Sequence, residues 1–195
     1  MEKIIPRWEW RTFGIDLGAG ETEVRLHPAD KTRESREIYI LSANSNDNTK
    51  IRDELMDIKT LLRVNPDGLE QWSPIMKAAF PIHITDLALV FKAFNIPIPF
   101  LNGDEFSYDT YMNQIIGSQR DLKPVNVFKR RTGFTINNCI VEIAQVEFNT
   151  QGVSTIAVEH TDPQLVMQTV RELKLTQYEN VNYIKAMKQV VGWDY

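Results

Sequence analysis

Cationic side chains alternate along NTKIRDELMDIKTLLR, residues 48–63, a segment with the pattern of two short strands joined by a tight turn. Lys50 and Arg52 share one face of the first strand, while Asp57 and Lys59 share one face of the second. Arginine forks and lysine point charges are suited to phosphate oxygens. One face of this hairpin is therefore a candidate surface for binding a phosphate-bearing anion.

Similar charge patterns recur in two other strand-like segments, residues 7–13 and 125–134. Taken one strand at a time, the pattern is equally typical of an ordinary solvated face of an antiparallel sheet. Its recurrence favours a shared charged surface instead. The candidate phosphate-binding residues of the three segments are Arg7, Arg11, Lys50, Arg52, Lys59, Lys129 and Arg131.

Isolated carboxylates lie on the same kind of strand, with Glu9 between two arginines and Glu142 and Glu159 among apolar neighbours. If the strands close into a barrel with these faces inward, the lumen holds both cations and carboxylates. Desolvating each of these charges costs several kcal/mol, so they need water, each other, or a polyanion with its metal. Carboxylate oxygens are the ligands that Mg²⁺ or Mn²⁺ takes when it bridges to phosphates.

Length and composition set the class of protein. A chain of 195 residues with 43% hydrophobic and 25% charged residues is enough for one domain with a proper core. The net charge of −4 argues against a protein that coats nucleic acid, because such proteins usually carry a net positive charge. The single Cys139 fits a reducing compartment. The first residues lack the apolar run of a signal peptide, and prolines and charges break the most apolar stretch, so we expect a cytoplasmic protein that does not enter membranes.

Strand-like segments dominate both ends of the chain and helices the middle. Besides the hairpin, we expect strands at 7–13, 36–42, 125–134, 138–148 and 153–160, with a turn at Asn137-Asn138. The expected helices follow Thr85, Asp162-Pro163 and Asn182 as N-terminal signals, and another ends at Gly117. Residues 81–124 form a helical and loop-rich insertion, whose aromatic residues either cover a tunnel mouth and hold a ring or simply pack.

Two other possible sites are weak. GIDLGAGET, residues 14–22, is similar to a phosphate loop of actin-like ATPases, but that architecture needs two large lobes and a second loop, which this chain is too short to hold. We therefore interpret the segment as a plain glycine-rich loop. The histidines at 27, 83 and 160 are isolated, without the spacing of zinc ligands, so a zinc site is not expected.

The charged segments follow one another in a recognisable order. REIYILS (36–42), KIR (50–52), DIK (57–59), KRR (129–131), VEIAQVE (141–147), IAVEHTDPQLVMQTVRELKL (156–175) and NYIKAMKQ (182–189) succeed one another along nearly the whole chain. This order and spacing resemble the CYTH, or triphosphate tunnel metalloenzyme, superfamily. The resemblance implies an α+β fold, an antiparallel closed eight-stranded β-barrel with charged walls and flanking helices. It also implies action on a triphosphate, such as tripolyphosphate, an RNA 5′-triphosphate, thiamine triphosphate or ATP.

Carried over residue by residue, the resemblance makes Lys50, Arg52, Lys59 and Arg131 phosphate ligands. Glu9, Glu142 and Glu159 become the catalytic residues that bind Mg²⁺ or Mn²⁺. Two departures affect this assignment: the opening E-x-E-x-K motif reads RWEWR here, and the late E-x-E reads Ala157-Val158-Glu159. Arg11 replaces the lysine and cannot act as a base, because it stays protonated. Losing two acidic ligands should weaken metal binding and leave anion binding intact.

Three interpretations remain open for residues 1–195, taken as a single CYTH-like domain. The first is a metal-dependent phosphohydrolase of a triphosphate or polyphosphate. The second is a non-catalytic protein that binds a polyphosphate or nucleotide as a sensor or scaffold. The third is a structural barrel with an internal lattice of salt bridges. In every case the expected partner is at most a small phosphorylated anion, with neither a nucleic-acid coat nor a membrane, and the oligomeric state is open.

Overall fold

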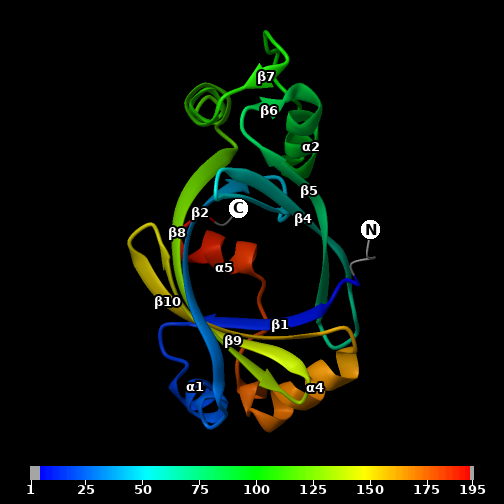
Figure 1. Cartoon of the computed structure of the whole chain (residues 1–195), viewed down its shortest axis with the longest axis vertical. Coiled ribbons are helices and arrows are strands. Elements are labelled where there is room, and N and C mark those ends of the chain that lie inside the picture. The colour runs from blue at the N-terminus through cyan, green and yellow to red at the C-terminus, as the bar shows by residue number, and fades with distance from the viewer. Residues whose placement is uncertain (1–4, 194–195) are drawn as a thin grey trace.

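The computed structural model describes residues 5–193, and within this range eight strands close into an antiparallel barrel (Figure 1). Around the barrel the strands are ordered β1-β10-β9-β8-β2-β3-β4-β5. Their bounds are β1 Trp8–Gly14, β2 Ala29–Ser42, β3 Asn48–Arg52, β4 Leu55–Val64, β5 Glu70–Ala79, β8 Leu122–Ile136, β9 Cys139–Phe148 and β10 Gln151–His160. The closed eight-stranded barrel with flanking helices that the sequence predicts is therefore confirmed, with β2 longer than the expected 36–42.

Helices and two minor strands complete the fold. The helices are α1 Gly18–Arg25, α2 Ile84–Phe94, α3 Tyr108–Thr110, the π-helical η1 Tyr111–Ile116, α4 Pro163–Glu172, the 3₁₀ turn η2 Leu175–Gln177 and α5 Tyr183–Val190. The minor strands, β6 Ile82–His83 and β7 Glu105–Phe106, pair with each other beyond the barrel. Among the described helices, none combines the length and the hydropathy that a membrane span requires.

Local sequence signals explain several turns and caps. Asp53 and Glu54, with φ of 51° and 58°, form the two-residue turn between β3 and β4, a conformation that matches the twist of a hairpin. The side chain of Asp162 accepts a hydrogen bond from the backbone of Gln164 and caps α4 as predicted. The cap predicted for α2 is wrong by two residues: His83 is the N-cap, and its ring accepts from the backbone N–H of Thr85.

The segment interpreted as a glycine-rich loop is in part a helix. After Asp16, whose side chain accepts from the backbone of Gly18, the chain forms α1. Gly20 lies against Leu175 and Ile156 so closely that a Cβ would come within 2.7 Å of the leucine side chain. The glycine therefore allows α1 to pack on the barrel, and no phosphate loop is formed.

Alternation along each strand separates two environments. In β1, Trp8 and Trp10 are buried on the outer face of the barrel under α4, whose Val166 and Val170 belong to the same apolar cluster. Glu9 and Arg11, on the intervening positions, point to the lumen. Much of the hydrophobic core thus lies outside the ring of strands, and the charged residues of β1 face the inside.

The insertion forms a separate apolar layer on the opposite side of the barrel. Leu87, Phe91 and Phe94 of α2 pack in one cluster with Met56 and Ile58 of β4. Figure 1 shows this segment, in green, as a lobe above the ring of strands. Burial against the barrel explains the helical apolar spacing that the sequence shows. The single-domain boundaries 1–195 and the limits 81–124 of the insertion stay predictions.

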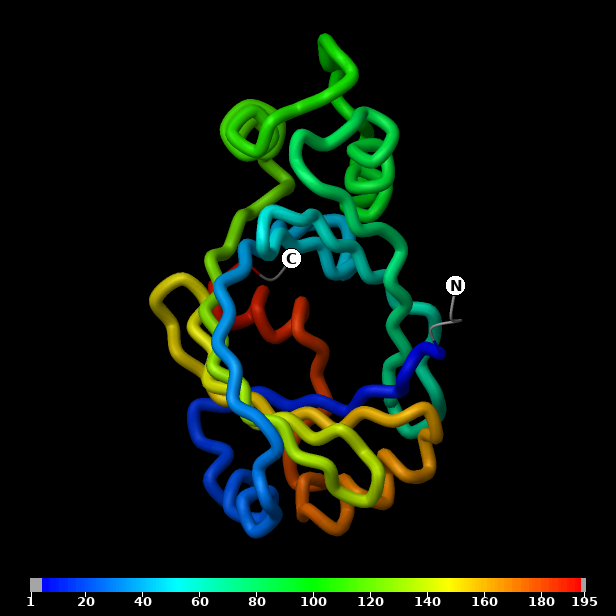
Figure 2. Tube along the Cα trace, viewed as in Figure 1, coloured from blue at the N-terminus to red at the C-terminus, as the bar shows by residue number. Residues whose placement is uncertain are grey.

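Helix α5 lies inside the ring of strands, as the red segment in Figure 2 shows. Its Ile184 and Met187 pack with Val125 of β8 and Phe148 of β9, which face inward. Its N-cap is Asn182, as predicted, whose side chain accepts from the backbone of Lys185. This helix fills part of the lumen with apolar side chains, so the polar cavity occupies only the remaining part.

Candidate functional site

A polar cavity of about 160 Å³ lies inside the barrel. Eight of the ten predicted site residues line it: Glu9, Arg11, Lys50, Lys59, Lys129, Arg131, Glu142 and Glu159. The other lining residues are Tyr39, Asn48, Trp72, Tyr183 and Ile184. The structure thus brings together residues from strands far apart in the sequence, as closure of the barrel requires, whereas their predicted phosphate-binding, catalytic and metal-binding roles stay predictions.

The two remaining predicted residues lie at the edges of this cavity. Arg7 lines an adjoining hollow of about 490 Å³, together with Glu9, Lys59 and Trp72, and its Nη1 is 3.8 Å from Glu159 Oε2. This hollow shares Glu9, Lys59, Trp72 and Glu159 with the cavity. Arg52 faces a separate groove of about 830 Å³ between the barrel and the insertion.

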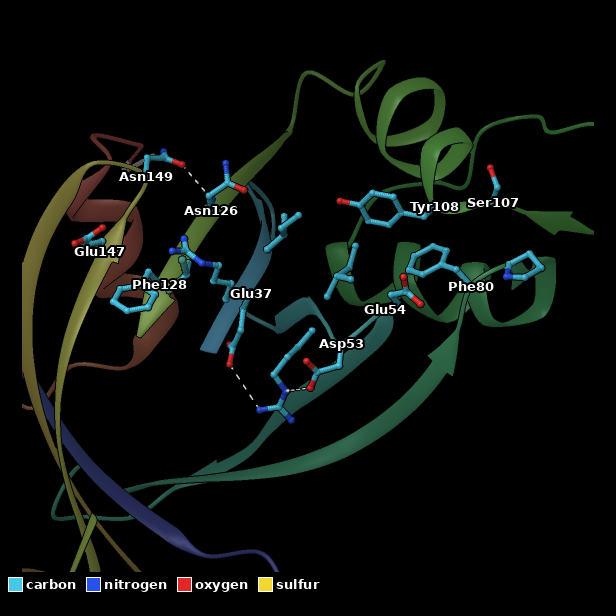
Figure 3. Close-up of a pocket in the computed structure, with 16 residues that line it drawn as sticks. Glu37, Asp53, Glu54, Phe80, Ser107, Tyr108, Asn126, Phe128, Glu147 and Asn149 are labelled. Atoms are coloured by element: carbon cyan, nitrogen blue, oxygen red, sulfur yellow. Dashed lines mark hydrogen bonds and ion pairs between the residues drawn. The ribbon is translucent and has the colours of Figure 1, made fainter. Parts of the chain in front are cut away.

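That groove is shown in Figure 3, with Phe80, which follows β5, and Tyr108 of the insertion across from Asn126 and Phe128 of the barrel. Arg52 is one of the residues that line the groove, and its guanidinium is 3.6 Å from Glu37 Oε1 and 3.7 Å from Asp53 Oδ2. Arg52 therefore belongs to the wall between groove and tunnel and is already engaged by carboxylates.

The acidic wall is built by β1, β10 and β9 around the guanidinium of Arg11. Arg11 Nε is 2.5 Å from Glu9 Oε1, Nη1 is 3.7 Å from Glu142 Oε1, and Nη2 is 4.0 Å from Glu159 Oε1. Burial alone would lower the pKa of Arg11, but the charges of Glu9, Glu142 and Glu159 raise it above its ordinary value. Arg11 is therefore a permanent cation in the middle of three carboxylates.

Glu159 has the most perturbed carboxylate of this wall. Burial raises its pKa to about 7, and the nearby charge of Glu9 adds to the effect, whereas Arg11 opposes it. Glu9 lies directly opposite Glu159 across the β1–β10 pair, which explains why two like charges share this site. Near neutral pH, Glu159 is thus able both to hold a proton and to release one.

The basic wall is organised by Glu37 of β2, a residue that is not among the site residues predicted from the sequence. Its side chain has no exposed surface, and its Oε2 accepts hydrogen bonds from Lys129 Nζ at 2.9 Å and Lys50 Nζ at 3.2 Å. Burial would raise the pKa of Glu37, but Lys129 and Lys50 lower it to about 2. Burial lowers the pKa of Lys129 to about 7, against the attraction of Glu37.

Two tyrosines complete this wall. Lys129 Nζ donates to Tyr39 Oη at 2.7 Å and lies 4.2 Å from the centre of the Tyr183 ring, which stacks on Tyr39. In the sequence, Glu37 and Tyr39 alternate with Ile38 and Ile40, so a charged and an aromatic residue share one face of a strand. That alternation was the available signal for Glu37.

Several polar groups of the cavity lack partners. Among residues 5–193, Arg131 Nε, Tyr183 Oη and Asn48 Oδ1 are buried without a hydrogen-bond partner, and all three residues line the cavity. Lys59 forms no ion pair with any described residue. Buried polar groups are nearly always satisfied in proteins, by protein, water or ligand. The side chains of Arg131, Tyr183 and Asn48 therefore mark where a polar ligand or ordered water would be held, and the exposed Lys59 lies beside them.

The carboxylates do not fit a divalent metal ion as they are arranged. Within the described residues, no group of three or more histidine, cysteine, aspartate or glutamate side chains is placed to hold a metal ion. The guanidinium of Arg11 lies among Glu9, Glu142 and Glu159, at the place where an ion bound to all three would lie. The Mg²⁺ or Mn²⁺ site predicted for these glutamates therefore stays a prediction that this geometry does not favour.

Solved structures with the same fold were found for nearly the whole chain. A candidate adenylyl cyclase from Hippeastrum, described as having a dominant triphosphatase activity, is similar with a TM-score of 0.52 at 11% identity, over 94% of this chain and 95% of that one. The PH1012 protein of Pyrococcus horikoshii is similar with a TM-score of 0.51 at 15% identity, over 92% of this chain and 98% of that one.

A candidate adenylate cyclase from Bacillus halodurans gives a TM-score of 0.51 at 13% identity, over 91% of this chain and 95% of that one. Identities this low show a shared fold and nothing about activity. The sequence itself matches no protein-family model and no curated protein.

Proposed function

We propose that this chain, which has a CYTH-like triphosphate-tunnel fold, binds a short phosphate chain inside its barrel. The ligand class is a small anion such as tripolyphosphate or the triphosphate group of a nucleotide. The observation that carries the proposal is the set of unpartnered polar groups, Arg131 Nε and Tyr183 Oη, facing one cavity with the unpaired Lys59.

These groups are the kind that recognise phosphate. A guanidinium N–H, a phenol O–H and an ammonium all donate hydrogen bonds, and a charge-assisted bond to an anion is about twice as strong as a neutral one. Asn48 adds an amide that presents either its oxygen or its NH₂ group, depending on the rotation of the side chain. The set is thus rich in donors, which suits a ligand made of acceptor oxygens.

The size of the cavity limits how the ligand enters. A volume of about 160 Å³ holds roughly five water molecules at about 30 Å³ each. The adjoining hollow offers about 490 Å³ and shares Glu9, Lys59 and Glu159 with the cavity. A chain of phosphates would enter with its leading end beside Arg131 and Tyr183, while its trailing part or an attached group lies near Trp72 and Arg7.

A purely structural lattice, the third interpretation from the sequence, accounts for only part of the wall. Glu37 forms ion pairs with Lys50, Lys129 and Arg52, and Arg11 neutralises part of the opposite wall. A lattice that existed only for stability would also satisfy the buried Arg131 Nε and Tyr183 Oη. Since neither atom has a partner among the described residues, binding accounts for more of the observed arrangement.

Hydrolysis of the bound phosphate chain is the second candidate. It is favoured by Glu159, whose pKa of about 7 is the value at which a carboxyl group works best as a general base or acid near neutral pH. The Hippeastrum protein, described as having triphosphatase activity, shows that this fold is compatible with hydrolysis. The metal dependence predicted from the sequence is not part of this proposal, because the three glutamates that would bind the metal ion surround Arg11 instead.

The test is isothermal titration of the purified protein with tripolyphosphate, in EDTA and in Mg²⁺, with phosphate release measured in the same samples and ATP as a second ligand. We expect saturable binding of one anion per chain. Lys59→Ala should weaken it about tenfold, the loss expected for one charge-assisted hydrogen bond.

Lys77→Ala is the matched control, because Lys77 is exposed on the neighbouring β5 and does not line the cavity. It should leave the affinity unchanged. Phosphate release would establish the hydrolase; binding without release would establish a sensor or scaffold. Absence of binding for both tripolyphosphate and ATP would overturn the proposal and leave the charged walls as structure.

A further inference from the structure

The guanidinium of Arg11 directs each of its nitrogens at a different strand. Nε contacts Glu9 on its own strand β1, Nη1 faces Glu142 on β9, and Nη2 faces Glu159 on β10, at 2.5, 3.7 and 4.0 Å. Three carboxylates from three strands thus converge on one planar cation. Such convergence of oxygen ligands is what a bound divalent ion usually requires.

The strand register explains how the arginine reaches this place. Arg11 lies directly opposite Ala157 on β10, and Ala157 lies directly opposite Glu142 on β9. The methyl group of Ala157 is the smallest side chain in this row, so the space between Arg11 and Glu142 is left to the guanidinium. Glu9 and Glu159 face each other in the next inward row of the β1–β10 pair.

Arg11 is fixed there by its surroundings. Only 8% of its side chain is exposed, its Nη1 donates to Thr155 Oγ1 at 3.3 Å, and its guanidinium lies 5.4 Å from the centre of the Tyr183 ring. Its backbone N–H donates to Asn180 Oδ1, and its carbonyl accepts from the N–H of Val181, the residue that precedes the N-cap of α5. The cation is therefore part of the packed barrel, unlike a mobile surface arginine.

An arginine in this position differs from a metal ion in its permanence. It stays charged at every pH that the fold tolerates, and no chelator removes it. A divalent cation that approached the three glutamates would meet a buried positive charge that neither moves nor titrates away. Like charges at this distance repel strongly where little water screens them.

We propose that the Arg11 guanidinium takes the place of a divalent metal ion among Glu9, Glu142 and Glu159, so that the tunnel neutralises its acidic wall from within and has no divalent-metal site of its own. The inference goes beyond ligand binding, because it concerns the ligand-free protein. It holds or fails whether or not the tunnel binds phosphate.

The test is a titration of ligand-free protein with Mn²⁺, followed by the electron paramagnetic resonance signal of the free ion. The wild type should show no saturable binding. Arg11→Ala empties the place among the carboxylates and should bind Mn²⁺ at least about tenfold more tightly, a gain of the size that one strong ligand contact supplies. Arg130→Ala, an exposed arginine on the outside of β8, is the control and should resemble the wild type.

A second variant covers the case in which Arg11→Ala fails to fold, which circular dichroism would reveal. Arg11→Gln removes the positive charge but keeps a side chain that can hydrogen-bond to the carboxylates, and this variant should also gain Mn²⁺ binding. The proposal is overturned if the wild type binds Mn²⁺ and Glu9→Gln weakens that binding. It is equally overturned if a folded Arg11 variant shows no gain over the wild type.

Discussion

Lys129 Nζ lies 2.9 Å from Glu37 Oε2 inside the barrel, and the side chain of Glu37 is completely buried. Lys50 donates to the same oxygen from β3, at 3.2 Å. One carboxylate on β2 therefore holds together the strands on both of its sides. Removing one partner of a buried ion pair leaves an uncompensated charge, which costs more than the pair itself contributes.

Glu37→Gln should lower the free energy of unfolding by about 3 kcal/mol, because it leaves Lys50 and Lys129 buried without their counter-charge. Urea denaturation followed by circular dichroism measures the change. Glu34→Gln is the matched control on the same strand, since Glu34 is exposed and pairs with Arg130 at 3.7 Å on the outside. It should change stability by less than about 0.5 kcal/mol, and equal losses in the two variants would contradict the role assigned to Glu37.

The acid limb of the stability curve should depend on the same residue. The pKa of Glu37 is lowered from 4.5 to about 2 in the folded state, so its contribution is complete above pH 4.5 and is lost as the pH falls towards 2. A shift of this size corresponds to about 3 kcal/mol. Between these pH values, the wild type should lose stability more steeply than Glu37→Gln. Parallel curves from urea melts at a series of pH values would show that Glu37 titrates normally in the fold.

Anion binding should weaken as the pH rises through neutrality. Burial lowers the pKa of Lys129 to about 7, so its positive charge is present below that pH and is lost above it. The affinity for tripolyphosphate, measured by calorimetry, should fall severalfold between about pH 6 and about pH 8. Lys129→Arg keeps its charge across this range and should flatten the dependence. Both proteins are titrated with the same ligand. If the affinity depends on pH to a similar degree in the wild type and in Lys129→Arg, the effect comes from titration of the phosphate and not of Lys129.

Much of this fold could be predicted from the sequence. Alternation in β1 and β8 put Glu9, Arg11, Lys129 and Arg131 on inward faces, because the period of a strand is two whatever its neighbours are. The N-caps at Asp162 and Asn182 were recognisable, since capping depends on residues two or three positions apart.

The partners of the charges could not be predicted in the same way. Whether Lys50 binds a phosphate or pairs with Glu37 depends on the register between β2 and β3. That register places Tyr39 opposite Lys50, 11 residues further along the chain, and local sequence signals do not determine it. Filling of the lumen by α5 depends likewise on tertiary packing. The helix at Gly18–Arg25 was missed because its glycines are poor helix formers, and packing overrides that propensity.

Two adjacent arginines on β8 lie on opposite faces of the barrel wall, one in the lumen and one on the outer surface. Arg131 lines the cavity with its Nε unpartnered, whereas Arg130 is exposed and faces Glu34. Arg131→Ala should weaken tripolyphosphate binding at least about tenfold, the loss of one or two charge-assisted hydrogen bonds, and Arg130→Ala should change it less than about twofold. Calorimetric titration of both variants decides the point. Equal effects would place the anion outside the barrel.

The two stacked tyrosines of the lumen allow a structural role to be distinguished from a role in ligand binding. Tyr39 Oη accepts a hydrogen bond from Lys129, whereas Tyr183 Oη is buried without a partner. Tyr39→Phe should therefore lower the free energy of unfolding by about 1 kcal/mol, and Tyr183→Phe should leave it unchanged or raise it. If the Tyr183 hydroxyl donates to a bound phosphate, Tyr183→Phe should still weaken tripolyphosphate binding about fivefold. Denaturation and calorimetry on the same preparations measure both quantities. A Tyr183→Phe protein with unchanged affinity would show that the ligand does not reach this hydroxyl, and the proposed path beyond Arg131 would be wrong.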